Sequence, residues 1–163
     1  NIAFIITRSF IDSSISDAVL KNIINNTYSV FEHKKIAPLV NIEKNKYILE
    51  LFYGPTYAFK DYALQFLNNL FVHVLQNSSK KITILGATSG DTGSAAINAF
   101  KRNEKVNVFI LHPYQMISEV QRRQMTTVLN KNIHNIAIRG TFDDCQNIIK
   151  NLFVDNDLQS KLL

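Results

Sequence analysis

The chain has 163 residues, of which 46% are hydrophobic and 19% are charged, a composition typical of a compact protein with a buried core. Its apolar runs are too short to cross a membrane, and its start has none of the features of a signal peptide. A formal charge of +5 would suit a nucleic-acid-binding protein, but the basic residues are scattered and do not alternate with aromatic residues. We therefore expect neither a membrane nor a nucleic acid as a partner.

The chain contains one cysteine, Cys145, so it cannot form an internal disulfide, and we expect a reducing compartment, the cytoplasm. The residue is interpreted as a small buried hydrophobe and not as a nucleophile. The histidines lack metal-ligand spacing, so no metal site is predicted. They are His33, His73, His112 and His134.

The first half of the chain is predicted to be mainly helical. Residues 14–26 have the apolar spacing of an amphipathic helix, and residues 47–52 are typical of a strand. Gly54 and Pro55 indicate a turn. Thr56 is then the expected N-cap of a long helix.

In the second half, three short apolar strands alternate with three helices. The predicted strands are residues 81–86, 106–112 and 135–138. A capping box of Ser118 with Gln121 and an N-cap at Thr141 indicate where the second and third helices begin. This βαβαβα order predicts an α/β fold with a parallel sheet and right-handed crossovers. We expect a helical, lysine-bearing part at 1–79 and the sheet-containing part at 80–163.

The loop after the first of these strands, "GATSGDTGS" (86–94), lies where parallel sheets bind ligands. It lacks the lysine of a P-loop and the glycine spacing of the dinucleotide fingerprint. Its amides and the hydroxyls of Thr88, Ser89 and Thr92 would still form an anion site at the start of a helix. Because Asp91 would repel a dianionic phosphate, the loop favours a monoanion such as an amino-acid carboxylate. The alternative is that Asp91 or Ser89 only caps the helix.

Lys60 stands where an apolar residue is expected. The apolar stripe of the long helix leads back to this position and contains Leu64, Leu67, Phe71 and Val74. Burial and the nearby helix N-terminus both disfavour an ammonium ion, so we expect a lowered pKa and a neutral amine that can attack aldehydes. The alternative is a lysine whose side chain extends past the end of the helix into water. Together with a carboxylate-binding loop, an interior amine indicates Schiff-base chemistry on an amino acid.

Four stretches resemble threonine synthase of the bacterial and yeast type: "ELFYGPTYAFKDYALQF", "ILGATSGDTGSAA", "QRRQMTTV" and "GTFDDCQNIIK". The resemblance implies the tryptophan synthase β-subunit fold of pyridoxal-phosphate enzymes, called fold type II. It also implies that Lys60 is the catalytic residue and binds pyridoxal 5′-phosphate as an internal aldimine, and that Asp91 faces the 3′ oxygen of this cofactor. By the same resemblance, the substrate carboxylate is held by Thr88, Ser89, Gly90 and Thr92.

The reaction that the resemblance implies converts O-phospho-L-homoserine and water to L-threonine and phosphate, a step of threonine biosynthesis. Lys60 would also move protons at the α and β carbons, with the cofactor as electron sink. The substrate phosphate needs cationic partners, for which Arg122 and Arg123 are candidates. The alternative for both arginines is a solvated helix face.

The chain is expected to be a portion of a longer protein. It begins with Asn1 and ends at "DLQSKLL" without a helix stop signal. Fold type II enzymes hold the cofactor phosphate in a separate glycine-rich loop, and the five glycines of this chain form no second cluster. We therefore expect that loop beyond Leu163 and expect the 163 residues alone to be inactive. The alternative to an enzyme portion is a truncated, inactive threonine synthase-like remnant. No oligomeric state follows from the sequence.

Overall fold

The computed structural model describes residues 2–158. The chain divides into two compact units, called unit 1 (up to Ser78) and unit 2 (from Ser79). No helix in the described range combines the length and the apolar character needed to cross a bilayer.

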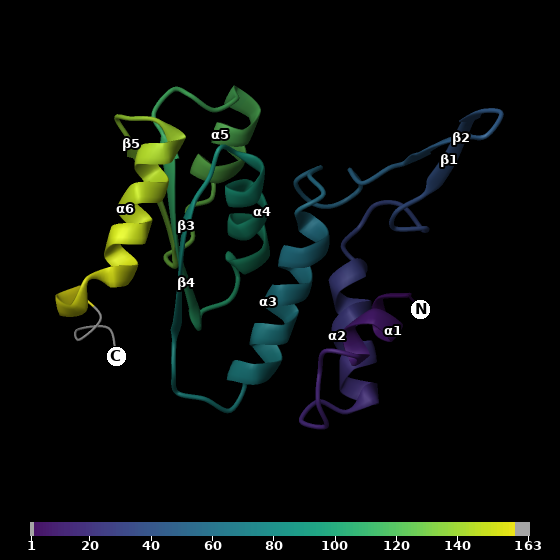
Figure 1. The fold of residues 1–163 in the computed structure, drawn as a ribbon. Helices are drawn as coiled ribbons and strands as arrows, with labels where there is room; N and C mark the ends of the chain where they lie inside the picture. Colours follow the sequence, from purple (N-terminus) through teal and green to yellow (C-terminus); the bar gives the residue numbers. More distant parts are fainter. Residues whose placement is uncertain (1, 159–163) are drawn as a thin grey trace. The chain divides into compact units, whose positions relative to one another are not determined.

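The described residues of unit 1 form three helices and a β-hairpin (Figure 1). The helices are α1 (Ile2–Arg8), α2 (Asp17–Tyr28) and α3 (Asp61–Leu75), and the antiparallel strands are β1 (Leu39–Glu43) and β2 (Lys46–Leu49). The prediction of a helix over 14–26 is confirmed by α2. The sequence analysis missed α1 and β1, and the strand predicted at 47–52 ends earlier. Every residue of the hairpin is exposed, so it lacks the inside–outside alternation by which strands are recognised.

Helices α2 and α3 pack through a small apolar core. Its buried members are Ile15, Leu20 and Ile24. Phe66 and Leu70 of α3 pack against this cluster, and their four-residue spacing places both on one helix face. Val74 is 60% exposed. The predicted stripe is therefore exposed at its Val74 end, whereas Leu64, Leu67 and Phe71 are half-buried.

Unit 2 has three layers. Its parallel sheet has the order β3–β4–β5, and these strands are Ile82–Ala87, Val106–Pro113 and Ile133–Ile138. Helices α4 (Asp91–Phe100) and α5 (Glu119–Thr126) lie on one side of the sheet, and α6 (Phe142–Val154) covers the other (Figure 1). The predicted α/β fold with a parallel sheet is confirmed, because α4 connects β3 to the parallel strand β4 and α5 connects β4 to the parallel strand β5.

The central strand β4 carries the core of unit 2. Val106 and Val108 are fully buried, as is Phe100 of α4. Leu111 packs on the other face of the sheet against Cys145 of α6. Cys145 has no exposed surface, and burial raises the pKa of its thiol. Its interpretation as a small buried hydrophobe is confirmed.

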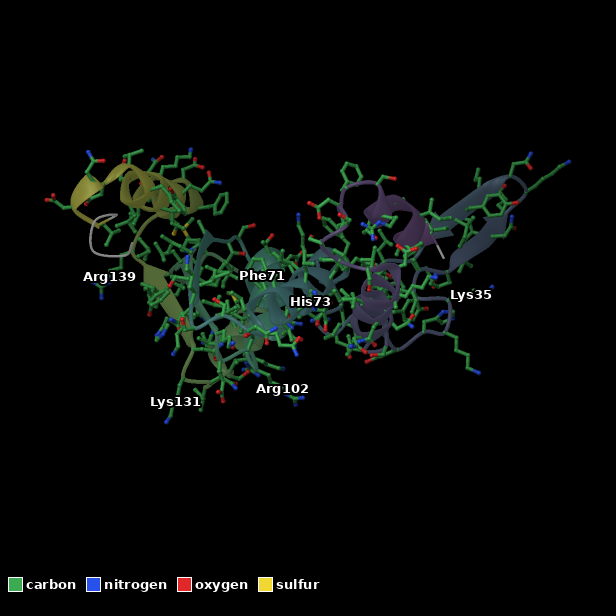
Figure 2. All side chains as sticks on the ribbon, turned by 90° about the horizontal axis from the view of Figure 1, so that it is seen from below. Lys35, Phe71, His73, Arg102, Lys131 and Arg139 are labelled. Carbon is green, nitrogen blue, oxygen red and sulfur yellow. The ribbon has the colours of Figure 1, made fainter. Side chains whose placement is uncertain are left out.

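Basic side chains of unit 2 gather at the amino ends of the strands. An open cavity of about 660 Å³ there is lined by Lys81, Lys101, Arg102 and Lys131 together with Glu104 and three asparagines. Figure 2 shows Arg102 and Lys131 extending outward from the edge of the unit. No lining residue of this cavity is aromatic, and it lies at the sheet edge opposite to the loop that follows β3.

Candidate functional site

Lys60 ends a turn and does not lie within a helix. Helix α3 begins at Asp61, and Lys60 is its N-cap with φ −62° and ψ −23°. The prediction that Thr56 is the N-cap, with Lys60 in the first helical turns, is wrong. Tyr57 has φ +61°, a left-handed conformation that a right-handed helix cannot contain, so the helix cannot begin before it.

The turn before α3 is tied together by Asp61. Its carboxylate accepts hydrogen bonds from the Thr56 N–H at 2.8 Å and from the Thr56 hydroxyl at 2.9 Å, and the residue is fully buried. A Cβ atom at Gly54 would lie 2.5 Å from a carboxylate oxygen of Asp61, so only glycine leaves room for this side chain. The sequence analysis missed Asp61, although a helix start beside a Gly-Pro-Thr turn is a place where a carboxylate finds donors.

The side chain of Lys60 is half-buried. Its Nζ lies 4.5 Å from the centroid of the Phe59 ring, which is a cation–π distance. The Lys60 carbonyl accepts the first hydrogen bond of the helix, from Leu64 N–H at 3.0 Å. The backbone is thus fixed on both sides of this lysine, and the amine extends from a rigid support.

The loop after β3 is built around Thr88. This residue is 2% exposed, and its hydroxyl oxygen accepts hydrogen bonds from Gly90 N–H at 3.0 Å and Gly93 N–H at 2.9 Å. Its own N–H donates to the Leu111 carbonyl of β4 at 2.9 Å. The hydroxyl of Thr88 therefore holds the loop and the start of α4 in shape. Its predicted contact with a substrate carboxylate stays a prediction.

Two glycines let the loop approach α5. Gly90 has φ +143°, a conformation essentially restricted to glycine, and a Cβ there would lie 2.2 Å from the Gln121 side chain. A Cβ at Gly93 would lie 2.5 Å from Thr88 and 2.8 Å from the sulfur of Met125. The glycines are thus required by close packing, apart from any ligand.

Asp91 is the first residue of α4 and is exposed. The N-cap is Gly90, and neither Asp91 nor Ser89 caps this helix through its side chain. The capping alternative is therefore wrong for both, because Thr88 already accepts the Gly93 N–H. The Asp91 carboxylate instead accepts a hydrogen bond from the Gln121 amide.

Gln121 has a role that the sequence analysis did not predict. Its backbone N–H donates to the Ser118 hydroxyl, as a capping box requires, but its side-chain oxygen accepts from that hydroxyl at 2.8 Å and its amide nitrogen donates to Asp91. The box is only half formed. The side chain of Gln121 instead connects α5 with the first residue of α4.

Ser89 and Thr92 are exposed at the start of α4. Two hydroxyls at the positive end of a helix dipole can donate hydrogen bonds to an anion. This donor set suits a carboxylate, as the sequence predicted, and its use stays a prediction.

Arg122 and Arg123 both pair with Glu119 on α5, each at 2.7 Å. Their hydrogen bonds lower the pKa of Glu119 to about 2. Both guanidinium groups lie on a solvated helix face, which is the alternative that the sequence left open. Arg122 also lines a cavity of about 530 Å³ near the carboxyl ends of β4 and β5, with His112 and Asn135.

Comparison with known proteins shows that the chain is similar to threonine synthases. The Pseudomonas aeruginosa enzyme is 54% identical over 154 residues, which is 94% of this chain and 33% of the relative. The Saccharomyces cerevisiae enzyme is 48% identical over 174 residues, covering 99% of this chain and 34% of the relative. The crystal structure of PLP-bound threonine synthase from Brucella melitensis matches with a TM-score of 0.88 at 42% identity, over 98% of this chain and 34% of that one. No family model matches.

The chain spans about a third of the length of these relatives. The match nevertheless extends over nearly the whole chain, so it includes both the turn at Lys60 and the loop at Thr88–Gly93. It also confirms the fold as that of the tryptophan synthase β-subunit type. Over nearly its whole length, this chain is therefore similar to about a third of a threonine synthase, as expected of a partial chain.

Proposed function

We propose that the protein containing this chain is a threonine synthase that converts O-phospho-L-homoserine and water to L-threonine and phosphate. The observation that carries the proposal is the 54% identity over 94% of the chain, which includes both chemically distinctive stretches. Such identity across a lysine-bearing turn and a hydroxyl-rich loop supports a shared reaction more strongly than a shared fold alone would.

The residues of both stretches fit pyridoxal 5′-phosphate and an amino-acid substrate. Lys60 offers a primary amine on a rigid turn, which suits an aldehyde. The Asp91 carboxylate offers an acceptor for the cofactor 3′ hydroxyl, and it is already oriented by Gln121. The cofactor, when bound, would supply an electron sink for charge that develops at the α and β carbons of the substrate.

Lys60 is proposed to act as a proton carrier once the substrate amine has replaced it. Its Nζ would take the proton from the α carbon and move protons at the β carbon, while phosphate leaves from the γ carbon and water adds at the β carbon. One lysine can serve both steps because the amine alternates between a base and an acid.

The loop after β3 is proposed to bind the substrate carboxylate through Ser89, Thr92 and the N-terminus of α4. Gly90 lets the backbone approach the ligand closely. The buried hydroxyl of Thr88 keeps the loop in shape through its hydrogen bonds to Gly90 and Gly93. The carboxylate would be fixed by donors that are already in place, which limits the entropy lost on binding.

The proposal is tested with the full-length protein, pyridoxal phosphate and O-phospho-L-homoserine. We expect phosphate and threonine to form in equal amounts, and we expect Lys60→Ala to abolish both. Lys131→Ala removes an exposed lysine and should leave turnover unchanged. A Lys60→Ala protein with wild-type turnover would refute the assignment.

The 163-residue chain alone is expected to bind the cofactor weakly and to be inactive, because its relatives are about three times as long. Full turnover by this isolated chain would contradict that expectation. If the gene encodes nothing beyond these residues, the protein would be the truncated, inactive threonine synthase-like remnant. We place the protein in the cytoplasm, a proposal supported by its single buried cysteine, and fractionation of cells would check it.

A further inference from the structure

The residue after Lys60 is a buried carboxylate, which is unusual for a helix start because Asp is rarely buried completely. Asp61 has no exposed surface. Burying a carboxylate is unfavourable unless hydrogen bonds compensate for the lost water. Two of these come from one residue five positions earlier, since the N–H and the hydroxyl of Thr56 donate to the two different carboxylate oxygens.

The segment closed by this carboxylate has a shape that it would not adopt by itself. Tyr57 has φ +61°, which is unfavourable for a residue with a side chain. Tyr57 N–H donates to the Gly54 carbonyl, and Asp61 N–H donates to the Ala58 carbonyl, each at 3.0 Å. The turn is thus a sequence of tight bends that persists because its ends are held together.

Lys60 is the last residue of this turn. Its Cα position is set on one side by the bends from Gly54 onward and on the other by α3. Any loosening between Thr56 and Asp61 would therefore let the Lys60 side chain swing away from the Phe59 ring, which Nζ now approaches to 4.5 Å.

We propose that Asp61, through its two hydrogen bonds to Thr56, is a positioning residue for the Lys60 amine. This inference rests on the proposed function, in which Lys60 is the reacting amine. Asp61 touches neither cofactor nor substrate in this role. It sets the direction from which the amine leaves the backbone, and misplacement by about 1 Å can reduce a rate by about a hundredfold.

A first experiment measures the accessibility of the amine, without any turnover. The cofactor-free full-length protein is labelled with a trace of acetic anhydride, and the rate at Lys60 is compared with that at Lys131 by mass spectrometry. In Asp61→Asn we expect the relative rate at Lys60 to rise by about fivefold, because the amine becomes more accessible to the reagent. In Thr56→Val, which keeps the charge of Asp61, we expect a rise of about twofold.

Three further results decide the proposal. Thr56→Ser retains both donors, and Lys60 in this variant should be labelled at the wild-type rate. Asp144→Asn removes a carboxylate that also accepts from a threonine N–H and hydroxyl, at an exposed helix start, and should have no effect at Lys60. A rise in Asp61→Asn without any rise in Thr56→Val would assign the effect to charge alone and overturn the proposal, as would no rise in either.

A second experiment uses steady-state kinetics. We expect Asp61→Asn to lower kcat by about tenfold to a hundredfold with little change in KM, because an amine out of place slows the chemistry and not substrate binding. If Asp61→Asn only lowered the amount of folded enzyme, kcat calculated per molecule of cofactor-bound enzyme would be unchanged. An unchanged kcat on that basis would also overturn the proposal. Since the labelling result does not depend on turnover, a failure of the proposed function can be told apart from a failure of this inference.

Discussion

Each unit contains a threonine–aspartate pair with the same chemistry. In unit 1 the N–H and hydroxyl of Thr56 donate to Asp61 at 2.8 and 2.9 Å, and in unit 2 the same groups of Thr141 donate to Asp144 at 2.7 and 2.8 Å. A glycine stands beside each carboxylate, since a Cβ on it would lie 2.5 Å or 2.8 Å from an aspartate oxygen.

The two pairs differ in spacing and in burial. Thr141 and Asp144 are three residues apart and exposed, and they form the capping box of α6. Thr56 and Asp61 are five residues apart and buried. A spacing of three fits the first turn of a helix, whereas a spacing of five encloses an additional bend. The same bonds therefore start a helix in one unit and hold a non-helical turn in the other.

Replacing each aspartate by alanine should give the largest difference in stability between the two pairs. Asp61→Ala leaves two buried donors without their acceptor, and we expect the free energy of opening α3 to fall by about 3 kcal/mol. Amide hydrogen exchange in the full-length protein would then accelerate roughly a hundredfold along α3. Asp144→Ala exposes its donors to water, so the amides of α6 should exchange less than about tenfold faster.

Equal acceleration in both helices would contradict this expectation, because burial would then contribute nothing. The matched control for each variant is the other helix of the same protein. Exchange along α3 should be unchanged by Asp144→Ala, and exchange along α6 should be unchanged by Asp61→Ala.

Replacing the glycine beside each aspartate by alanine should also destabilise unit 1 more than unit 2, but by a smaller amount. Gly54→Ala would bring a methyl group within 2.6 Å of the Asp61 Cβ atom, and because that side chain is buried we expect destabilisation of about 2 kcal/mol. Gly140→Ala meets an exposed carboxylate that can rotate away. Its effect should be within about 0.5 kcal/mol, as for most surface substitutions.

Thermal melts of the two alanine variants beside the wild type would measure this difference. Glycine also costs conformational entropy on folding, so an alanine that fits would stabilise the protein slightly. A more stable Gly54→Ala protein would show that the carboxylate of Asp61 has room to move, and the turn would then not be rigid.

The same contrast explains what could be predicted from the sequence. Thr141 as the N-cap of α6 was predicted because capping is a local pattern that repeats in many helices. The start of α3 was predicted wrongly, because nothing in the pattern shows that Tyr57 adopts a positive φ. The apolar residues after Ala63 continue the helical spacing backwards past the real helix start, and periodicity alone cannot say where it stops.

The loop after β3 shows a similar limit. The position of Thr88 to Gly93 beyond a parallel strand follows from the alternation of strands and helices, and it was predicted. Which hydroxyl supports the loop and which ones face outward depends on side-chain directions. The link from Gln121 to Asp91 joins residues 30 positions apart, and no local pattern could reveal it.

The smallest expected effect is the dependence of the exposed Thr141–Asp144 pair on pH. Hydrogen bonds from Thr141 hold the pKa of Asp144 below its ordinary value of 3.8. Because the folded pKa is lower than the unfolded one, the pair stabilises the folded state above pH 3.8, and this stabilisation is lost as the pH falls through the folded pKa. A carboxyl NMR titration should give a midpoint below 3.8 for Asp144, and Thr141→Ala should return it toward that value. A wild-type midpoint at the ordinary value would mean that the hydrogen bonds from Thr141 do not persist in solution, and the comparison between the two pairs would lose its exposed member.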